Sequence, residues 1–470
     1  KIDELFAKRD SAQAKADSAK AKSFEGLASS KRSLGWKEKA DIPATDVVFT
    51  GATVLPMDDL SVIHDAVVHV KGNKIVAVGP RGSIDIPKNA VVYDLTGKTL
   101  MPGFVDVHAH LGSSDGGIHA QQSWAFLVNL AFGVTTNHDP SNNSQMIFAS
   151  SEMVKKGMVV GPRIFSTGTI LYGAEGDFKT VIDKLDDAID AVHRTAAWGA
   201  FSVKSYNQPR RDQRQMIIEA ARQAGIMVVP EGGSTLHANM THVIDGHTTV
   251  EHSIPVAPLY EPELRLLSRF GTGYTPTLIV GYGGIWGENY WYAHSDVWKN
   301  ERLMQFVPRS VVDPRSRRRE IAPEEEYHHF ALAKTAAEVL HRGGNVQLGA
   351  HGQLQGLGAH WELWMFAQGG MTNHEALRAA TWMGARAIGL DGDLGSIREG
   401  KLADLIVIDG DPLQDLHVSQ DIDYTMINGR LYDARTMAQL EPEKRPPPKL
   451  PNAEGVAASA TCACTGAEVH

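Results

Sequence analysis

Short apolar segments alternate with amphipathic segments over most of the chain, and this alternation limits the possible folds more than any other feature of the sequence. The segments that we predict to be strands are residues 103–109, 133–138, 162–168, 199–205, 226–231, 247–252, 273–279 and 345–350. Helical patterns follow most of them, for example at 208–224 and 372–388. Eight such units predict an α/β fold, a parallel (β/α)8 TIM barrel over residues 101–395. An open doubly wound sheet is the alternative, but no GxGxxG sequence follows the first strand.

Further strand patterns come from both ends of the chain. Residues 46–100 contain DVVFTGATVL, AVVHVKGNKIVAV and VVYDLTGKTL, and residues 396–440 contain ADLIVIDG and YTMINGRLYD. Because neither half is expected to bury a core alone, we predict one small composite β-sandwich built from both. Residues 1–45 are predicted to form a polar extension or linker, and residues 441–470 a proline-rich tail.

Composition narrows the class of protein. A chain of 470 residues is long enough for a large barrel and a smaller domain. It has 46 Lys and Arg against 55 Asp and Glu, without a long basic stripe, so a nucleic-acid partner is not expected. The absence of a long apolar run predicts that there is no transmembrane segment, and no signal-peptide pattern is present. The two cysteines, Cys462 and Cys464, exclude a disulfide framework.

The strongest signal of chemistry is the sequence GFVDVHAH at residues 103–110. Side chains two positions apart on a strand point the same way, so Asp106, His108 and His110 share one face and the apolar residues between them share the other. Two imidazoles at the carboxyl end of a barrel strand can bind one metal ion. The alternative is a pair of core histidines satisfied by hydrogen bonds, but the paired arrangement favours metal binding.

Polar residues also stand at the ends of later predicted strands. Lys204 is either paired with a carboxylate or neutral, and a neutral lysine can form a carbamate that bridges two metal ions. Glu231 is a candidate ligand or general base, or an ordinary loop glutamate. His252 is predicted to point where Val250 points, and His351 follows the eighth strand. Each residue is weak evidence alone, but together they predict a metal site at the active face of the barrel.

Residues 46–440 resemble the amidohydrolase superfamily. The segments that carry the resemblance are MPGFVDVHAHL, GVTTNHD, TTVEHS, ALRAATWMGARAIGL and LGSIREGKLADLIVIDGDPL. The branch is similar to the imidazolonepropionase- and prolidase-like amidohydrolases. Two segments, PEGGSTLHANMTHVIDGHTTVEHS and GAHGQLQGLGAHWELWMF, resemble secreted members fused behind a periplasmic (TolB-like) β-propeller. The resemblance therefore implies a periplasmic or secreted protein whose precursor includes an N-terminal propeller.

The resemblance also implies a set of metal ligands. His108, His110, Lys204 and His252 match the family pattern, in which the lysine is N6-carboxylated. The pattern departs at strand five, where Glu231 replaces a histidine, and at strand eight, where His351 replaces an aspartate that accepts a proton from the metal-bound water. Either His351 acts as base or ligand, or Glu231 takes over as base, or the site is degenerate.

The function implied is a metal-dependent amidohydrolase that cleaves an amide or peptide C–N bond with a metal-activated hydroxide. We expect His108, His110 and carboxylated Lys204 to hold one divalent ion, and Lys204, Glu231 and His252 a second. Zinc is the first choice, and Mn or Fe are alternatives. The expected substrate is a dipeptide or an N-acyl amino acid. A deaminase or cyclic amidase of the same fold is one alternative, and a non-catalytic binding or assembly module is another.

The segment at 281–322 is expected to set substrate selectivity, because loops at this barrel face build the pocket. The candidate substrate-binding or supporting residues are Tyr172, His237, His242, Trp286 and Tyr290. The arginines at 315 and 317–319 form a basic run, which is predicted to be a solvated or interface charge run; the alternative is that it steers an anionic substrate. A homo-oligomer is expected on general grounds.

Overall fold

The computed structural model describes residue 15 and residues 37–112, 118–176, 179–233 and 235–450. The chain divides into two units, Lys1–Ala40 and Asp41–His470, and the second contains all of the structure below. Most of the predicted N-terminal extension, and the tail from residue 451 with both cysteines, lie outside the described residues.

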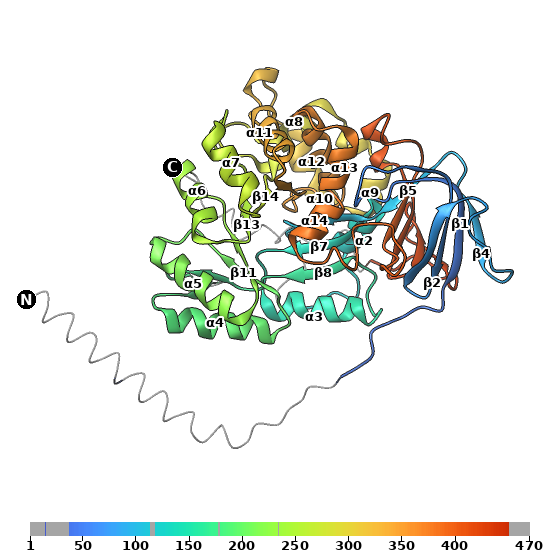
Figure 1. The fold of residues 1–470 in the computed structure, drawn as a ribbon, viewed down its shortest axis with the longest axis horizontal. Coiled ribbons are helices and arrows are strands. Elements are labelled where there is room, and N and C mark those ends of the chain that lie inside the picture. Colours follow the sequence, from blue (N-terminus) through green and yellow to red (C-terminus); the bar gives the residue numbers. More distant parts are fainter. Residues whose placement is uncertain (1–14, 16–36, 113–117, 177–178, 234, 451–470) are drawn as a thin grey trace, which may run out of the picture. The chain divides into compact units, whose positions relative to one another are not determined.

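Ten short parallel strands form three sheets in the centre of the second unit (Figure 1). Their bounds are β6 (Phe104–Asp106), β7 (Val134–Asp139), β8 (Arg163–Ser166), β9 (Ile170–Tyr172), β10 (Lys179–Val181), β11 (Ser202–Ser205), β12 (Met227–Pro230), β13 (Thr249–Glu251), β14 (Gly273–Thr275) and β15 (Asn345–Val346). The orders are β6-β7-β8, β10-β9-β11-β12 and β13-β14-β15. All eight predicted strands are present, and β9 and β10 are additions that the sequence did not predict.

Backbone hydrogen bonds join neighbouring sheets at two of their edges. Val107 N donates to Leu348 O over 3.1 Å, which joins the end of β6 to the segment after β15. Thr248 N donates to Val228 O over 3.0 Å, which joins β13 to β12. The fold is therefore α/β with strands ordered as in a barrel, and closure of the three sheets into one barrel stays a prediction.

Helices alternate with these strands and cover them. Figure 1 shows α3, α4 and α5 along one side of β7, β8 and β11. The bounds are α2 (Trp124–Ala131), α3 (Ser144–Lys155), α4 (Leu185–Ala197), α5 (Arg211–Ala224), α6 (Leu236–Asp245), α7 (Glu261–Arg269), α8 (Gly287–His294), α9 (Glu301–Phe306), α10 (Arg309–Arg317), α11 (His329–His341), α12 (Leu357–Gln368), α13 (Asn373–Ala379) and α14 (Trp382–Ala387).

One predicted helix is divided. The pattern at 372–388 forms α13 and α14, because Thr381 has a non-helical backbone between them. Its hydroxyl donates to Leu377 O over 2.7 Å, which satisfies a carbonyl at the end of α13. The predicted helix at 208–224 is observed as α5, which ends at Gly225 in the left-handed conformation typical of a C-terminal cap.

The chain segments before and after the parallel strands join in one nine-stranded sheet (Figure 1). Its strands are β1 (Asp46–Val54), β2 (Ile63–Lys71), β3 (Lys74–Pro80), β4 (Val91–Asp94), β5 (Thr99–Pro102), β16 (Leu405–Ile408), β17 (Ile422–Ile427), β18 (Arg430–Asp433) and β19 (Gln439–Glu441). The two halves meet where β5 pairs antiparallel with β16. Side chains of both halves, such as Val54 and Leu405, share one apolar cluster. The composite sheet is thus observed, and its sandwich form stays a prediction.

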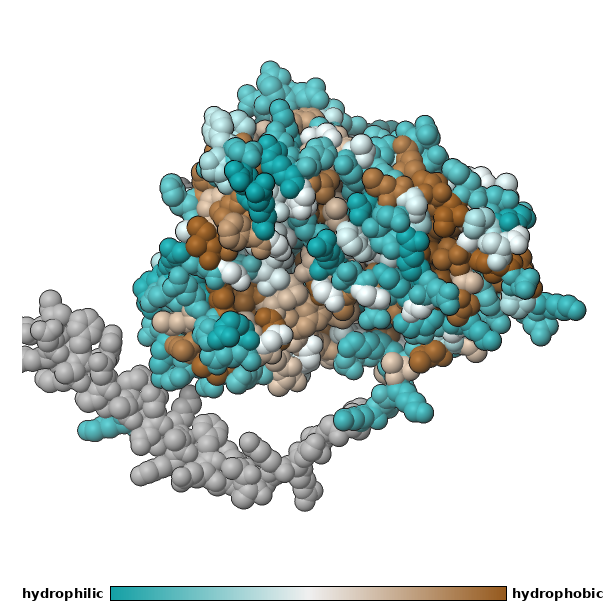
Figure 2. Space-filling view, in the orientation of Figure 1, coloured by the Kyte–Doolittle hydropathy of each residue, from teal (hydrophilic) through white to brown (hydrophobic). Residues whose placement is uncertain are grey.

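The surface of the second unit is mixed. Figure 2 shows hydrophilic residues over most of the visible face, with hydrophobic residues gathered where Figure 1 places the nine-stranded sheet. Within the described ranges, no helix combines the length and apolar character needed to cross a bilayer.

Candidate metal centre

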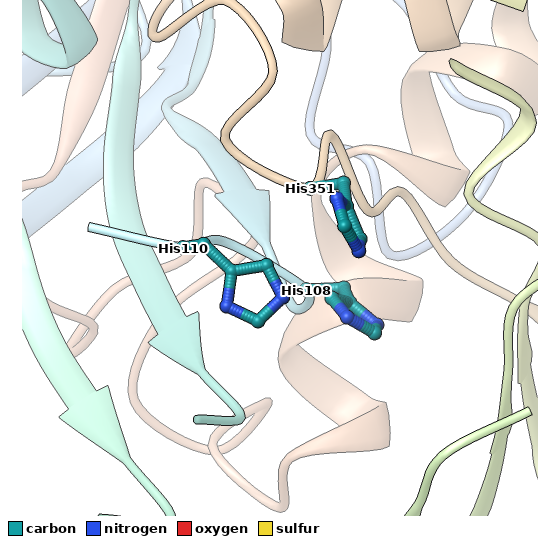
Figure 3. Close-up of side chains that lie close together, drawn as sticks. All are labelled: His108, His110 and His351. Atoms are coloured by element: carbon teal, nitrogen blue, oxygen red, sulfur yellow. The ribbon is translucent and has the colours of Figure 1, made fainter. Parts of the chain in front are cut away.

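Three histidines from distant parts of the sequence lie together at the ends of β6 and β15 (Figure 3). Each of His108, His110 and His351 offers one ring nitrogen, and these atoms all lie within 4.8 Å of one another. The His351 ring centroid lies 5.1 Å from that of His108 and 4.6 Å from that of His110. In the part of the chain that the structure describes, this is the one group of three or more such residues close enough to hold a metal ion.

The alternation after β6 places both histidines on the site side. Val107 packs in an apolar cluster with Ile388, and Ala109 packs in another with Phe126. His351 N donates to His108 O over 2.7 Å, which fixes the two segments against each other. His351 itself has a φ of 57°, a left-handed turn that directs the chain away after β15.

A second group of buried side chains adjoins the three histidines. The His252 ring centroid lies 4.8 Å from that of His108 and 5.0 Å from that of His351. His252 Nε2 lies 3.1 Å from Glu231 Oε1, and Glu231 Oε2 lies 2.7 Å from Lys204 Nζ. The structure therefore brings together all six residues proposed as ligands or catalytic groups, and their individual roles stay predictions.

Charge pairing keeps Glu231 ionised in this buried place. Burial acts to raise the pKa of Glu231, but the nearby Lys204 and His252 hold it well below its usual range. The lysine lies in β11 and the glutamate directly follows β12, and these two strands are neighbours in register. The alternative in which Lys204 pairs with a carboxylate is thus the arrangement observed, and the carboxylate is Glu231.

One prediction about side-chain direction is wrong. His252 was expected to point where Val250 points, but Val250 packs in the large apolar cluster whereas the His252 ring faces His108. The reason is the backbone of His252, whose φ of 64° ends the strand alternation of β13. Thr277 Oγ1 lies 2.8 Å from His252 Nδ1 and orients the ring.

A buried carboxylate supports His108 from behind. Glu251 Oε2 lies 2.7 Å from His108 Nδ1, and Thr275 donates to Glu251 Oε1 over 3.2 Å. Burial raises the pKa of Glu251 to about 7, and burial together with the charge of Lys204 lowers the pKa of His108. With Nδ1–H donated to Glu251, the lone pair of His108 Nε2 faces the site, as a metal ligand requires.

The surroundings of His108 Nε2 show whether these residues fit a metal ion. His108 Nε2 is buried and has no hydrogen-bond partner among the residues that the structure describes. An unsatisfied buried acceptor is costly, and the neighbouring imidazoles are of the type that binds Zn²⁺, Mn²⁺ or Fe²⁺. The donor set therefore fits a divalent transition metal.

A series of hydrogen bonds also supports His351. Gln353 Oε1 lies 3.3 Å from His351 Nδ1, and Gln353 Nε2 donates to Glu288 Oε1 over 3.2 Å. Arg315 Nη1 lies 3.5 Å from Glu288 Oε2 and also donates to the carbonyl of Gln353. Arg315, whose side chain is 40% exposed, therefore also ties α10 to the site, and the solvated or interface charge run stays a prediction.

Sequence reasoning missed these supporting residues. Glu251 had a usable signal, since it is a charged residue inside an apolar strand and directly precedes His252. Glu288 and Gln353 had none, because only the folded chain brings α8 and the turn after His351 together.

The other predicted residues lie in varied surroundings. Tyr172 packs edge-on against Tyr206, and His237 is exposed on α6. His242 is buried with its ring centroid 4.8 Å from that of His247. Trp286 precedes α8 and is 39% exposed, whereas Tyr290 lies edge-on to Tyr327 and Phe330 and so pins α8. Their roles in binding substrate or supporting the metal stay predictions.

Sequence comparisons relate the chain to known proteins. Residues 334–432 match the model of the amidohydrolase family. The chain is 24% identical to the ochratoxinase of Aspergillus niger over 68% of this chain and 72% of that protein. It is also 24% identical to a 5-methylthioadenosine/S-adenosylhomocysteine deaminase of Pelotomaculum thermopropionicum, over 85% of this chain and 96% of the relative.

Solved structures show the same fold. The structure of a Xaa-Pro dipeptidase with bound methionine superimposes with a TM-score of 0.64 at 20% identity, and the match covers 83% of this chain and all of that one. The ochratoxinase structure gives a TM-score of 0.63 at 18% identity, over 83% of this chain and 96% of the other. The expected imidazolonepropionase branch and the propeller fusion stay predictions. The sequence and structural likenesses together relate residues 334–432 to the amidohydrolase family, support a hydrolase, and show the fold of the prolidase- and ochratoxinase-like structures.

Proposed function

We propose that this chain is a metal-dependent hydrolase of an amide C–N bond in a dipeptide or an N-acyl amino acid. The observation that carries the proposal is the meeting of His108, His110 and His351, with ligand nitrogens within 4.8 Å of one another. Three imidazoles beside an ionised carboxylate are the donor set of a hydrolytic metal centre.

His108, His110 and His351 would hold one divalent metal ion, with zinc as the first choice, and a second ion at Glu231 and His252 is the alternative to the base role of Glu231 given below. A bound ion would supply a Lewis acid and lower the pKa of a water molecule. We assign His351 to the metal rather than to the base role, and the position of its ring against both other histidines supports this assignment.

Glu231 is then the group that moves the proton. Its carboxylate is ionised, so it accepts a proton from the attacking water and returns it to the leaving amine. Lys204 Nζ holds Oε2 of that carboxylate in place, and His252 Nε2 faces its Oε1. Thr277 and Glu251 keep the rings of His252 and His108 oriented towards the site.

Lys204 has a second proposed form. The resemblance implies that relatives carboxylate this lysine, and a carbamate there would add a bridging ligand in place of the ion pair with Glu231. Intact mass measured under non-denaturing conditions distinguishes the forms, because a carbamate adds the mass of one CO₂ and is lost on acidification.

The names of two similar proteins support the substrate class. One relative is an ochratoxinase and one structural neighbour is a Xaa-Pro dipeptidase, and the second name describes a dipeptide substrate. A deaminase is the second candidate, because a relative that is matched over 96% of its length carries that name. Both reactions need the same metal-activated water, and only the pocket separates them.

The experiment is metal content per chain followed by a substrate panel. We expect one to two equivalents of zinc, manganese or iron in the purified protein, and loss of both metal and activity in His108→Ala. His417→Ala changes an exposed histidine and is the matched control. Metal-replete, active His108→Ala would overturn the site. Metal content without cleavage of dipeptides or N-acyl amino acids, but with ammonia release from aminopurine nucleosides, would favour the deaminase. Protein that holds no metal even after addition of metal and bicarbonate would be the degenerate module.

The periplasmic or secreted location, the propeller and the homo-oligomer remain proposals that rest on the resemblance and on general expectation.

A further inference from the structure

A pocket of about 500 Å³ lies beside α10, and none of the residues assigned to the metal centre lines it. The lining residues that carry the argument are Trp298, Arg309, Asp313, Ser316, Arg317, Arg319 and Ile321. Three of them come from the basic run or its flanks, which the proposed reaction does not use. The pocket is large enough for a small organic molecule.

The charge of the pocket is positive. Asp313 Oδ1 lies 3.8 Å from Arg309 Nη1, and Asp313 Oδ2 lies 3.4 Å from Arg317 Nη2. One carboxylate therefore faces two exposed guanidinium groups. Arg319 has no carboxylate partner in the described ranges, and its Nη1 donates to Ser316 O over 3.3 Å. Three arginines against one aspartate leave an excess of positive charge that an anion would balance.

Two of the residues that line the pocket each have a buried polar atom without a partner. Ser316 is 4% exposed, and its Oγ has no hydrogen-bond partner among the described residues. Arg319 Nε is buried and likewise lacks one. A buried hydroxyl or N–H without a partner costs free energy, and the oxygens of an anionic group would satisfy both.

The walls of the pocket are flat and apolar in part. The guanidinium of Arg319 lies over the ring of Trp298, with 5.2 Å between its carbon and the ring centroid. Ile321 also lines the pocket and is 76% exposed. An exposed isoleucine beside a stacked Arg–Trp pair offers a surface for a planar ring.

We propose that this pocket is a second binding site, for a small planar organic anion: an aromatic or heteroaromatic ring that bears a carboxylate, sulfonate or phosphate. The anionic group contacts Ser316 and Arg319, and the ring lies against Trp298 and Ile321. The site adjoins the active site through α10, whose Arg315 holds Glu288 and the turn after His351.

The test is calorimetric titration of the metal-loaded protein with naphthalene-1-sulfonate. A sulfonate is chosen because it is a weak ligand for transition metals, so the metal centre contributes little to the signal. We expect one site per chain, with binding about ten-fold weaker in Arg319→Gln and also weakened in Ser316→Ala. Arg342→Gln removes an arginine that directly follows α11 and pairs with Glu261, and this variant should bind as the wild type does.

Two further ligands separate the contributions. Methanesulfonate has the charge without the ring, and naphthalene-1-methanol has the ring without the charge, so each should bind at least ten-fold more weakly. Equal binding of methanesulfonate would overturn the proposal in favour of a simple anion site, and equal binding of the alcohol would overturn it in favour of an apolar groove. No binding at millimolar concentration, or unchanged binding in Arg319→Gln, would also overturn it. His108→Ala should retain binding, whether or not the proposed hydrolysis is correct.

Discussion

His108 Nδ1 lies 2.7 Å from Oε2 of Glu251, and both side chains are almost completely buried. The pair fixes which nitrogen of His108 faces the other histidines. A carboxylate that accepts from a ligand's second nitrogen orients the ring and raises its basicity. Glu251 is therefore as much a part of the candidate metal centre as the ligands are.

Replacing Glu251 should weaken metal binding without removing a ligand. Glu251→Leu leaves His108 Nδ1 without an acceptor, and we expect metal affinity to fall about 10- to 100-fold. Glu251→Gln keeps an acceptor oxygen but loses the charge, so its effect should be smaller. Competition with a chelating dye measures both affinities. Glu261→Gln, an exposed glutamate on α7, is the control, and unchanged affinity in Glu251→Leu would contradict the supporting role.

Local sequence patterns predicted the strands, but they did not predict every side-chain direction at the strand ends. The period of two around His108 and His110 is sufficient to place both imidazoles in the site, because Val107 and Ala109 must be buried on the other side. The same rule fails at His252, where a single left-handed residue turns the side chain away from the direction of Val250. Backbone conformation at one residue is set by tertiary packing, which a pattern of apolar residues does not contain.

Long-range partners are the other part that the sequence does not reveal. Motif reasoning selected Lys204 and Glu231 separately, and the ion pair between them follows only from the register of β11 and β12. Glu288 lies in α8 and Arg315 in α10, and no local pattern connects either helix to Gln353. The composite sheet was predictable because each end of the chain carries strands too few to bury a core alone.

The ion pair between Lys204 and Glu231 makes a prediction about stability. In protein stripped of metal, Lys204→Met leaves a buried carboxylate without its cation and should lower the free energy of unfolding by about 3–5 kcal/mol. The double variant Lys204→Met/Glu231→Gln should recover most of that loss, because no buried charge remains. Denaturant unfolding of the chelator-treated proteins measures both changes.

An exposed pair provides the control for that measurement. Lys299 Nζ lies 2.8 Å from Asp296 Oδ2, and both side chains are more than half exposed. Lys299→Met should therefore cost less than about 1 kcal/mol. The assignment of a buried charge pair fails if Lys204→Met costs no more than this control, or if the double variant loses as much as the two single changes together.

A substitution at Gly429 tests the contact between the β17–β18 turn and the β2–β3 turn of the nine-stranded sheet. It lies in the turn between β17 and β18 with a φ of 76°, and a Cβ there would overlap the carbonyl oxygen of Gly72 in the β2–β3 turn. Gly400 also has a positive φ, of 86°, but a Cβ there meets no atom within 4 Å. Gly400→Ala should cost about 1 kcal/mol from backbone strain alone, and Gly429→Ala about 3 kcal/mol or more. Equal losses in denaturant unfolding would show that the two turns are not in close contact.

His360 makes a prediction about pH that is independent of the metal centre. It is fully buried on α12, where Nε2–H donates to Phe132 O over 2.9 Å and Nδ1 lies 3.0 Å from Ser419 Oγ. Ser419 Oγ also accepts from Trp364 over 3.1 Å, so its own hydrogen is directed to His360 Nδ1 and the ring is neutral. Burial lowers the pKa of His360 to about 3.

A folded-state pKa below the unfolded value of about 6.5 means that the unfolded chain binds more protons between these values. The contribution of His360 to stability is therefore complete above pH 6.5 and is lost as the pH falls towards 3. Between pH 7.5 and pH 5.0 this amounts to about 2 kcal/mol, since each pH unit below 6.5 is worth about 1.4 kcal/mol. His360→Gln keeps a donor for Phe132 O and has no proton to bind. Between pH 7.5 and pH 5.0, the free energy of unfolding of this variant should therefore fall by about 2 kcal/mol less than that of the wild type. Protonation of the metal ligands affects both proteins equally and cancels in the difference. Parallel pH profiles for the two proteins would show that His360 does not titrate in this way.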